Sequence, residues 1–248
     1  MSSDILVFVE YKDAAPRKAS LELLSAGKRI AEKLSGRLYA VVLGSDIRGI
    51  ADVIRGYCDA VIVAENATMA DYSWDTTGSV LSSIIEKYEP AILLGTSSMT
   101  GKDLFPRIAA RFQAAIISDA VGFDFEGAVL KVKKPLYGGK VISWLAPKLD
   151  TLAIVTFRPN SFAIGEPGMN GEIIEEDISA GQNPAMKTVS FEKAASKKVD
   201  LQEADFIICG GRGMKAAENF KLLDDIVEIM GGRVGASRSV VDTKWREY

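Results

Sequence analysis

The sequence contains no histidine among its 248 residues and only two cysteines, Cys58 and Cys209. Without histidine, a Ser-His-Asp triad, a histidine-assisted cysteine nucleophile and a histidine-ligated metal are all excluded. Two cysteines so far apart are too few for a thiolate zinc site and are typical of reduced thiols. Few routes to side-chain catalysis remain, so the composition favours chemistry carried by a bound cofactor.

Long apolar runs and a strong charge of one sign are also missing. No stretch approaches the roughly 20 apolar residues that span a bilayer, and the net charge is only -3. We therefore expect neither membrane insertion nor nucleic-acid binding. The N-terminus passes from Met1-Ser2-Ser3-Asp4 into an apolar run without a basic leader, which predicts a cytoplasmic protein.

Short apolar runs alternate with amphipathic stretches through the first 160 residues, as in α/β proteins. Strands are predicted over residues 5–10, 38–43, 60–64 and 91–95, and helices over residues 19–34, 47–57, 76–88 and 103–112. This order predicts a mainly parallel, doubly wound domain over residues 1–160. Three shorter strands, over residues 129–133, 139–145 and 151–157, are predicted as an antiparallel or mixed extension of its sheet.

A stretch rich in Gly, Pro, Ser and Asn follows, and we interpret residues 161–199 as a linker or arm. The second domain is predicted over residues 200–248. Its apolar run Phe206-Ile207-Ile208-Cys209 ends in Gly210-Gly211-Arg212-Gly213, and a helical pattern follows from Lys215 to Met230. A strand that is followed by a glycine turn and the start of a helix is typical of an anion-binding pocket.

A second apolar segment then leads into Gly235-Ala236-Ser237-Arg238. Ligands of doubly wound sheets bind at the carboxyl ends of the strands, so the two glycine turns, each with an arginine, are predicted to flank one extended anionic cofactor. One β-α-β unit is too small to bury a sheet on both faces. We therefore interpret this region as the first part of an incomplete Rossmann-like domain.

One alternative lies in the first domain. Gly95-Thr96-Ser97-Ser98-Met99-Thr100-Gly101-Lys102 follows a predicted strand and superficially resembles a phosphate-binding loop. Its intervals do not fit that motif, because five residues separate the two glycines and Asp103 stands where a hydroxyl belongs. A helix-capping turn near Asp103 is the plainer interpretation.

Several segments together resemble the alpha subunit of the electron-transfer flavoproteins. They are 210–215, 218–220 and 234–242 in the second domain, and 5–10, 101–110, 117–119 and the Arg158-Pro159-Asn160 exit in the first. The resemblance covers essentially the whole chain. It implies an electron carrier rather than a substrate-converting enzyme, and one half of a heterodimer with a beta subunit that exchanges electrons with redox partner proteins.

The resemblance also implies which residues hold the cofactor, FAD. Gly211, Arg212 and Gly213 form the turn that contacts it, while Ser237 and Arg238 lie close to the flavin ring. The family pattern continues past Asp242 with a Gly-Gln-Thr/Ser-Gly loop and further strands that this chain lacks. We therefore expect a C-terminally truncated chain from which FAD is easily lost. Two other functions stay open: an adenine-nucleotide-hydrolase-like enzyme using ATP at the first sheet, and a non-redox docking scaffold for a beta subunit.

Overall fold

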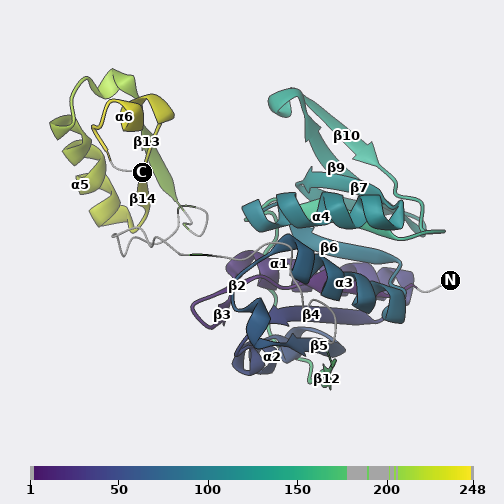
Figure 1. Ribbon diagram of the computed structural model, residues 1–248. Helices are drawn as coiled ribbons and strands as arrows, with labels where there is room; N and C mark the ends of the chain where they lie inside the picture. Colours follow the sequence, from purple (N-terminus) through teal and green to yellow (C-terminus); the bar gives the residue numbers. More distant parts are fainter. Residues whose placement is uncertain (1–2, 178–188, 190–200, 202–203, 205, 247–248) are drawn as a thin grey trace. The chain divides into compact units, whose positions relative to one another are not determined.

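The computed structural model describes residues 3–177, 189, 201, 204 and 206–246. The chain divides into two compact units, Met1–Phe191 and Glu192–Tyr248. Figure 1 traces both units.

The first unit is built on a seven-stranded sheet in the order β12-β5-β4-β1-β6-β11-β7, and every neighbouring pair of strands is parallel. Its strands are β1 (Ile5–Phe8), β4 (Leu38–Gly44), β5 (Ala60–Glu65), β6 (Ile92–Thr96), β7 (Ala115–Ala120), β11 (Ala153–Phe157) and β12 (Glu172–Glu175). The same unit contains helices α1 (Lys18–Leu34), α2 (Arg48–Ile54), α3 (Trp74–Tyr88) and α4 (Met99–Phe112). The α/β fold with a mainly parallel sheet is therefore confirmed.

Helices cover both faces of this sheet (Figure 1), and strand β1 shows why. Its side chains alternate between the two faces. Ile5 and Val7 pack in the core beneath α1 and α2, whereas Leu6 and Phe8 pack in the core beneath α3 and α4. All four are buried. A strand that is apolar on both faces must be covered on both, which places β1 in the middle of the sheet.

The predicted mixed extension of the sheet is wrong in detail. Residues 153–157 form β11, which lies parallel between β6 and β7. The other two predicted strands belong to a separate antiparallel sheet in the order β10-β9-β8, made of β8 (Gly122–Glu126), β9 (Val129–Leu136) and β10 (Val141–Leu145). A short hairpin of β2 (Tyr11–Lys12) and β3 (Ala15–Pro16) follows β1.

Helix α4 begins earlier than predicted. Ser98 caps it by accepting a hydrogen bond from the Gly101 backbone N–H at 2.9 Å, so the capping turn lies at Ser98 and not near Asp103. Pro106 consequently lies inside the helix, although proline favours the first turn. That preference is what misplaced the predicted start.

The predicted linker over residues 161–199 also needs correction. Residues 172–175 form β12, which pairs with β5 from Glu172 opposite Ala60 to Glu175 opposite Val63. The glycine and proline residues around this stretch favour a loop, so the sequence pattern does not reveal the short edge strand, which has two half-buried isoleucines. Residues 178–188 and 190–199 of the expected linker lie outside the described residues.

The second unit contains two parallel strands, β13 (Ile207–Gly210) and β14 (Arg233–Ala236), with helix α5 (Lys221–Met230) between them and the short helix α6 (Arg238–Asp242) after them. Phe220 and Val240 are its fully buried large side chains among the residues described. None of the described helices in either unit combines the length and the apolar character needed to cross a membrane.

Candidate functional site

The carboxyl ends of β13 and β14 bring the two glycine turns of the second unit together. In the parallel register Gly210 lies opposite Ala236, and the Ser237 backbone N–H donates to the Gly210 carbonyl at 3.0 Å. A Cβ placed on Gly211 would lie 3.9 Å from Ser237 Oγ. Residues more than 20 positions apart in sequence therefore lie beside each other at one strand edge.

The first turn runs through Gly211, Arg212 and Gly213. Arg212–Met214 forms a short 3₁₀ turn, closed by hydrogen bonds from the Met214 N–H to the Gly211 carbonyl and from the Lys215 N–H to the Arg212 carbonyl, both 3.0 Å. Arg212 and Gly213 are exposed. A Cβ on Gly213 would meet nothing within 4 Å, so the protein leaves open space beside this backbone.

The second turn presents Ser237 and Arg238. Ser237 is exposed, and its hydroxyl shares a hydrogen bond of 3.1 Å with the Ser239 hydroxyl. Arg238 Nε lies 3.8 Å from Asp242 Oδ2, while the Arg238 side chain is 95% exposed. So long and exposed an ion pair holds the guanidinium weakly, and Arg238 is available to an anionic partner.

One part of the predicted anion pocket is wrong. The helix expected from Lys215 begins at Lys221, because Lys215 adopts a left-handed backbone with φ of 66°. The Asn219 side-chain amide donates to the Met214 carbonyl at 2.6 Å and stabilises this irregular entry. The helix N-terminus is therefore not at the glycine turn, where the side chains of Arg212 and Lys215 are exposed.

A Cβ on Gly210 would lie 2.4 Å from the ring of buried Phe220. This glycine is thus needed for close packing of the Phe220 ring against the strand. The first turn therefore joins a structural glycine, Gly210, to Gly213, which borders open space.

The alternative site in the first unit has a different geometry. A cavity of about 200 Å³ lies at the carboxyl ends of β1 and β4, and its lining includes Glu10, Arg17, Tyr72 and Thr100. Burial raises the pKa of the Glu10 carboxyl, which accepts a hydrogen bond of 2.7 Å from the Ser98 hydroxyl. Of the Gly95–Lys102 segment only Thr100 lines the cavity, so that segment does not wrap a phosphate there.

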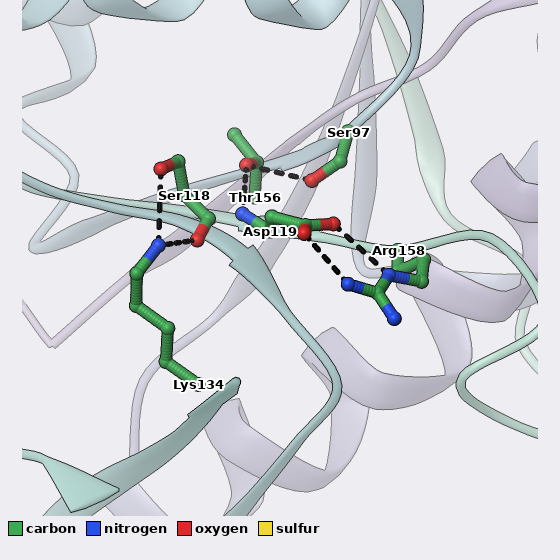
Figure 2. Close-up of polar contacts among 6 residues, drawn as sticks. All are labelled: Ser97, Ser118, Asp119, Lys134, Thr156 and Arg158. Carbon is green, nitrogen blue, oxygen red and sulfur yellow. Dashed lines mark hydrogen bonds and ion pairs between the residues drawn. The ribbon is translucent and has the colours of Figure 1, made fainter. Parts of the chain in front are cut away.

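A polar network at the ends of β6, β7 and β11 was missed by sequence reasoning (Figure 2). The Asp119 carboxylate accepts hydrogen bonds from Arg158 Nε at 3.1 Å and from Arg158 Nη2 at 2.7 Å. This pairing holds the pKa of the Asp119 carboxyl below its usual value. Thr156 Oγ1 accepts the Asp119 backbone N–H at 3.1 Å and shares a hydrogen bond of 2.9 Å with Ser97 Oγ.

The segment that follows β11 is held by a second contact, in addition to the Asp119–Arg158 pair. The buried Glu22 carboxylate in α1 accepts the Ser161 backbone N–H at 3.1 Å and the Phe162 N–H at 3.4 Å. Burial raises the pKa of the Glu22 carboxyl, and its effect outweighs that of these hydrogen bonds, which lower the pKa. The only sequence signal for this anchor was an acidic residue on the apolar face of a predicted helix.

Two family models match the chain. The Electron transfer flavoprotein domain matches residues 5–198, and the Electron transfer flavoprotein FAD-binding domain matches residues 200–248. Together they include both halves of the candidate site and the Asp119–Arg158 pair.

Curated proteins are similar over nearly the whole chain. Protein FixB of Clostridium saccharobutylicum is 34% identical over 98% of this chain and 74% of its own length. The electron transfer flavoprotein subunit alpha of Bacillus subtilis (strain 168) is 32% identical over 100% of this chain and 76% of its own. That of Thermoanaerobacterium thermosaccharolyticum is 29% identical, over 98% and 75%.

Proposed function

Because this chain belongs to the electron-transfer flavoproteins as an alpha subunit, we propose that its second unit holds FAD between the turns at Gly211 and Ser237. The family membership makes the chain a subunit of an electron carrier. It does not favour a nucleotide-hydrolysing enzyme or a non-redox scaffold. When bound, FAD supplies the redox chemistry, and the protein supplies binding, orientation and charge.

The convergence of two turns at one strand edge carries this proposal. Gly211 and Gly213 let backbone N–H groups approach an anionic group closely, and Arg212 adds a cation at the same turn. The open space beside Gly213 and the exposure of Arg212 fit an extended phosphate-bearing ligand. These three residues are proposed to contact FAD from the first turn.

Ser237 and Arg238 are proposed to lie beside the flavin ring. Both are exposed at the end of β14, and Arg238 has only a long contact with Asp242. A guanidinium next to a group that gains negative charge stabilises the charged form and raises the reduction potential.

The alpha subunit is proposed to act with a beta subunit and with redox proteins that donate and accept its electrons. This follows from the family, in which relatives are named as alpha subunits. A cytoplasmic location stays a prediction.

Redox titration of Arg238→Ala in the complex with the beta subunit tests the site. Removing one nearby positive charge from a partly desolvated site should disfavour the reduced, negatively charged form by roughly 1–3 kcal/mol, which lowers the potential. Arg238→Lys should recover only part of this, because an ammonium lacks the planar fork. Arg111→Ala in α4 is the control and should leave the potential unchanged. If Arg238→Ala also leaves it unchanged, Arg238 is not beside the flavin.

A further inference from the structure

A cavity of about 200 Å³ in the first unit lies at the carboxyl ends of β1 and β4. The chain passes from β1 through α1 to β4 on one side of β1, whereas β6 lies on its other side and leads into α4. The cavity lining includes Thr100 in the first turn of α4. The cavity therefore lies where the strand order reverses, which is where doubly wound sheets bind their ligands. It has room for roughly six or seven water molecules, and thus for a small molecule.

Glu10 lies in the wall of this cavity and is 8% exposed. The Glu10 backbone N–H donates to Ser20 Oγ at 2.9 Å, and the Glu10 carbonyl accepts the Arg17 N–H at 2.9 Å. The Ser98 hydroxyl donates to Glu10 Oε1 at 2.7 Å. The carboxyl group is thus held in place before a ligand arrives, and this preorganisation reduces the entropy that is lost on binding.

The contacts of Glu10 with the protein do not require a carboxyl group. A glutamine side-chain oxygen could accept the Ser98 hydrogen bond as well, and it would avoid the cost of burying a charge. Burial raises the pKa of the Glu10 carboxyl, while the Ser98 hydrogen bond and the charge of Arg17 lower it and so favour the ionised form. An ionised carboxyl has acceptor sites for about four hydrogen bonds. Acceptor capacity therefore remains for a ligand that carries N–H donors.

The remaining lining of the cavity indicates the shape of that ligand. Leu43 and Met69 line the cavity and are 7% and 5% exposed, so they form apolar walls. Tyr11 and Tyr72 also line it. Apolar and aromatic walls around a few polar groups are typical of sites for small ring compounds. A flat ring with N–H donors along one edge matches both these walls and Glu10.

A phosphate group does not match this lining. Of the Gly95–Lys102 segment only Thr100 lines the cavity, so this glycine-containing segment does not surround an anion there. Glu10 is a carboxyl group in the wall, and a like charge disfavours the binding of a second anion. The chemistry of the cavity is thus opposite to that of the proposed FAD site, which has an arginine at each of its two turns.

We propose that this cavity binds a small flat molecule that presents two adjacent N–H donors, the edge of an amidine, to the Glu10 carboxylate. Two parallel N–H···O bonds to one carboxylate are strong and fix the orientation of the ligand. The ring of the ligand then lies between the apolar and the aromatic walls. This site is independent of the proposed FAD site, because every residue that lines it belongs to the first unit.

Ligand-observed NMR titration of the full chain with benzamidine, benzamide and benzoate tests the proposal. The three probes share a ring and differ in their polar edge. Benzamidine presents N–H donors on two nitrogens, benzamide presents a donor beside an acceptor, and benzoate presents acceptors alone. Benzamidine should bind with a Kd of about 1 mM or tighter, as expected of a ligand of this size. Benzamide should bind several-fold more weakly, and benzoate at least about 10-fold more weakly.

Two variants, each with a matched control, test the cavity itself. Glu10→Gln keeps an acceptor for Ser98 and should weaken benzamidine binding at least about 10-fold. Glu22→Gln changes another buried carboxyl, which does not line the cavity, and should leave binding unchanged. Ala70→Trp should block the cavity, because Ala70 lines it and is exposed, whereas Ala67→Trp beside the same 3₁₀ turn is exposed without lining it. Circular dichroism shows whether each variant keeps its fold.

Loss of benzamidine binding in Glu10→Gln and in Ala70→Trp, with binding kept in both controls, supports the proposal; if Glu10→Gln does not fold, Ala70→Trp decides. Benzamidine binding that neither variant weakens, or that the controls weaken equally, would place the probe elsewhere and overturn the proposal. Benzamide that binds as tightly as benzamidine would remove the need for two donors. Benzoate as the tightest probe would make the cavity an anion site, and a folded wild type that does not bind benzamidine would refute the site outright.

Discussion

Thr156→Val should destabilise the first unit far more than loss of the neighbouring ion pair does. The Thr156 side chain is 4% exposed and its hydroxyl serves two groups, the Asp119 backbone N–H and Ser97 Oγ. Valine keeps the shape and removes the acceptor, which leaves Ser97, 8% exposed, and the partly buried Asp119 amide without this partner (Figure 2).

The magnitude follows from the burial of the groups left behind. An unsatisfied buried polar group costs about 1–3 kcal/mol, so two groups, one of them partly hydrated, should lower the free energy of unfolding by about 2–4 kcal/mol. The Asp119–Arg158 pair is bidentate. Its side chains are 43% and 51% exposed, so its loss in Arg158→Ala should cost no more than about 1 kcal/mol.

Urea unfolding followed by circular dichroism measures both variants. Thr151→Val at an exposed site is the control and should change stability by less than about 0.5 kcal/mol. Adding Ser97→Ala to Thr156→Val should restore part of the loss, because it removes one of the unsatisfied groups. If Thr156→Val costs no more than Arg158→Ala, the network does not depend on this hydroxyl and the reasoning is refuted.

Three further outcomes are expected. Burial raises the pKa of the Glu10 carboxyl above its usual value of 4.5. Its contribution to stability is therefore complete below pH 4.5 and is lost as the pH rises through the pKa of the folded state. Glu10→Gln should make the free energy of unfolding less dependent on pH in this window. A Cβ at Gly210 would lie 2.4 Å from a buried ring whereas one at Gly213 would touch nothing. Gly210→Ala should therefore lower the melting temperature of the second unit, and Gly213→Ala should leave it almost unchanged while weakening FAD binding. Cys58 is buried with its pKa raised to about 12, and Cys209 is exposed, so peptide mass spectrometry after brief iodoacetamide treatment should find Cys209 alkylated and Cys58 intact; equal labelling would contradict the burial of Cys58.

The central sheet could be predicted because its strands are short, apolar and buried on both faces. Strand β4 is buried along its whole length, and its continuous apolar sequence therefore predicts a strand. The position of β11 could not be predicted, because a continuous apolar strand pairs equally well in a parallel or an antiparallel neighbourhood. Only the packing of β6 and β7 on either side selects the parallel arrangement.

The candidate site was predictable in its residues and less so in its backbone. Glycine turns after two apolar runs placed Gly211 and Ser237 at the same strand edge, as the structure does. The start of α5 was misplaced because a helical pattern gives no sign of the left-handed residue Lys215. Lysine is uncommon in that conformation, and a side-chain hydrogen bond from Asn219, distant by only a few residues, stabilises it.

Residues that carry the family likeness fall into two physical groups, and the difference argues for a ligand. Gly101 is required by the fold, because a Cβ there would lie 1.9 Å from the Thr96 carbonyl oxygen, and the Asp119 carboxylate has a bidentate partner in Arg158. Gly213 and Arg238 have no such reason within the described chain: one borders open space and the other is 95% exposed. A residue whose identity the fold does not demand is explained by what approaches it. The open space at Gly213 and the exposure of Arg238 therefore support the proposal of an anionic ligand at this edge of the second unit.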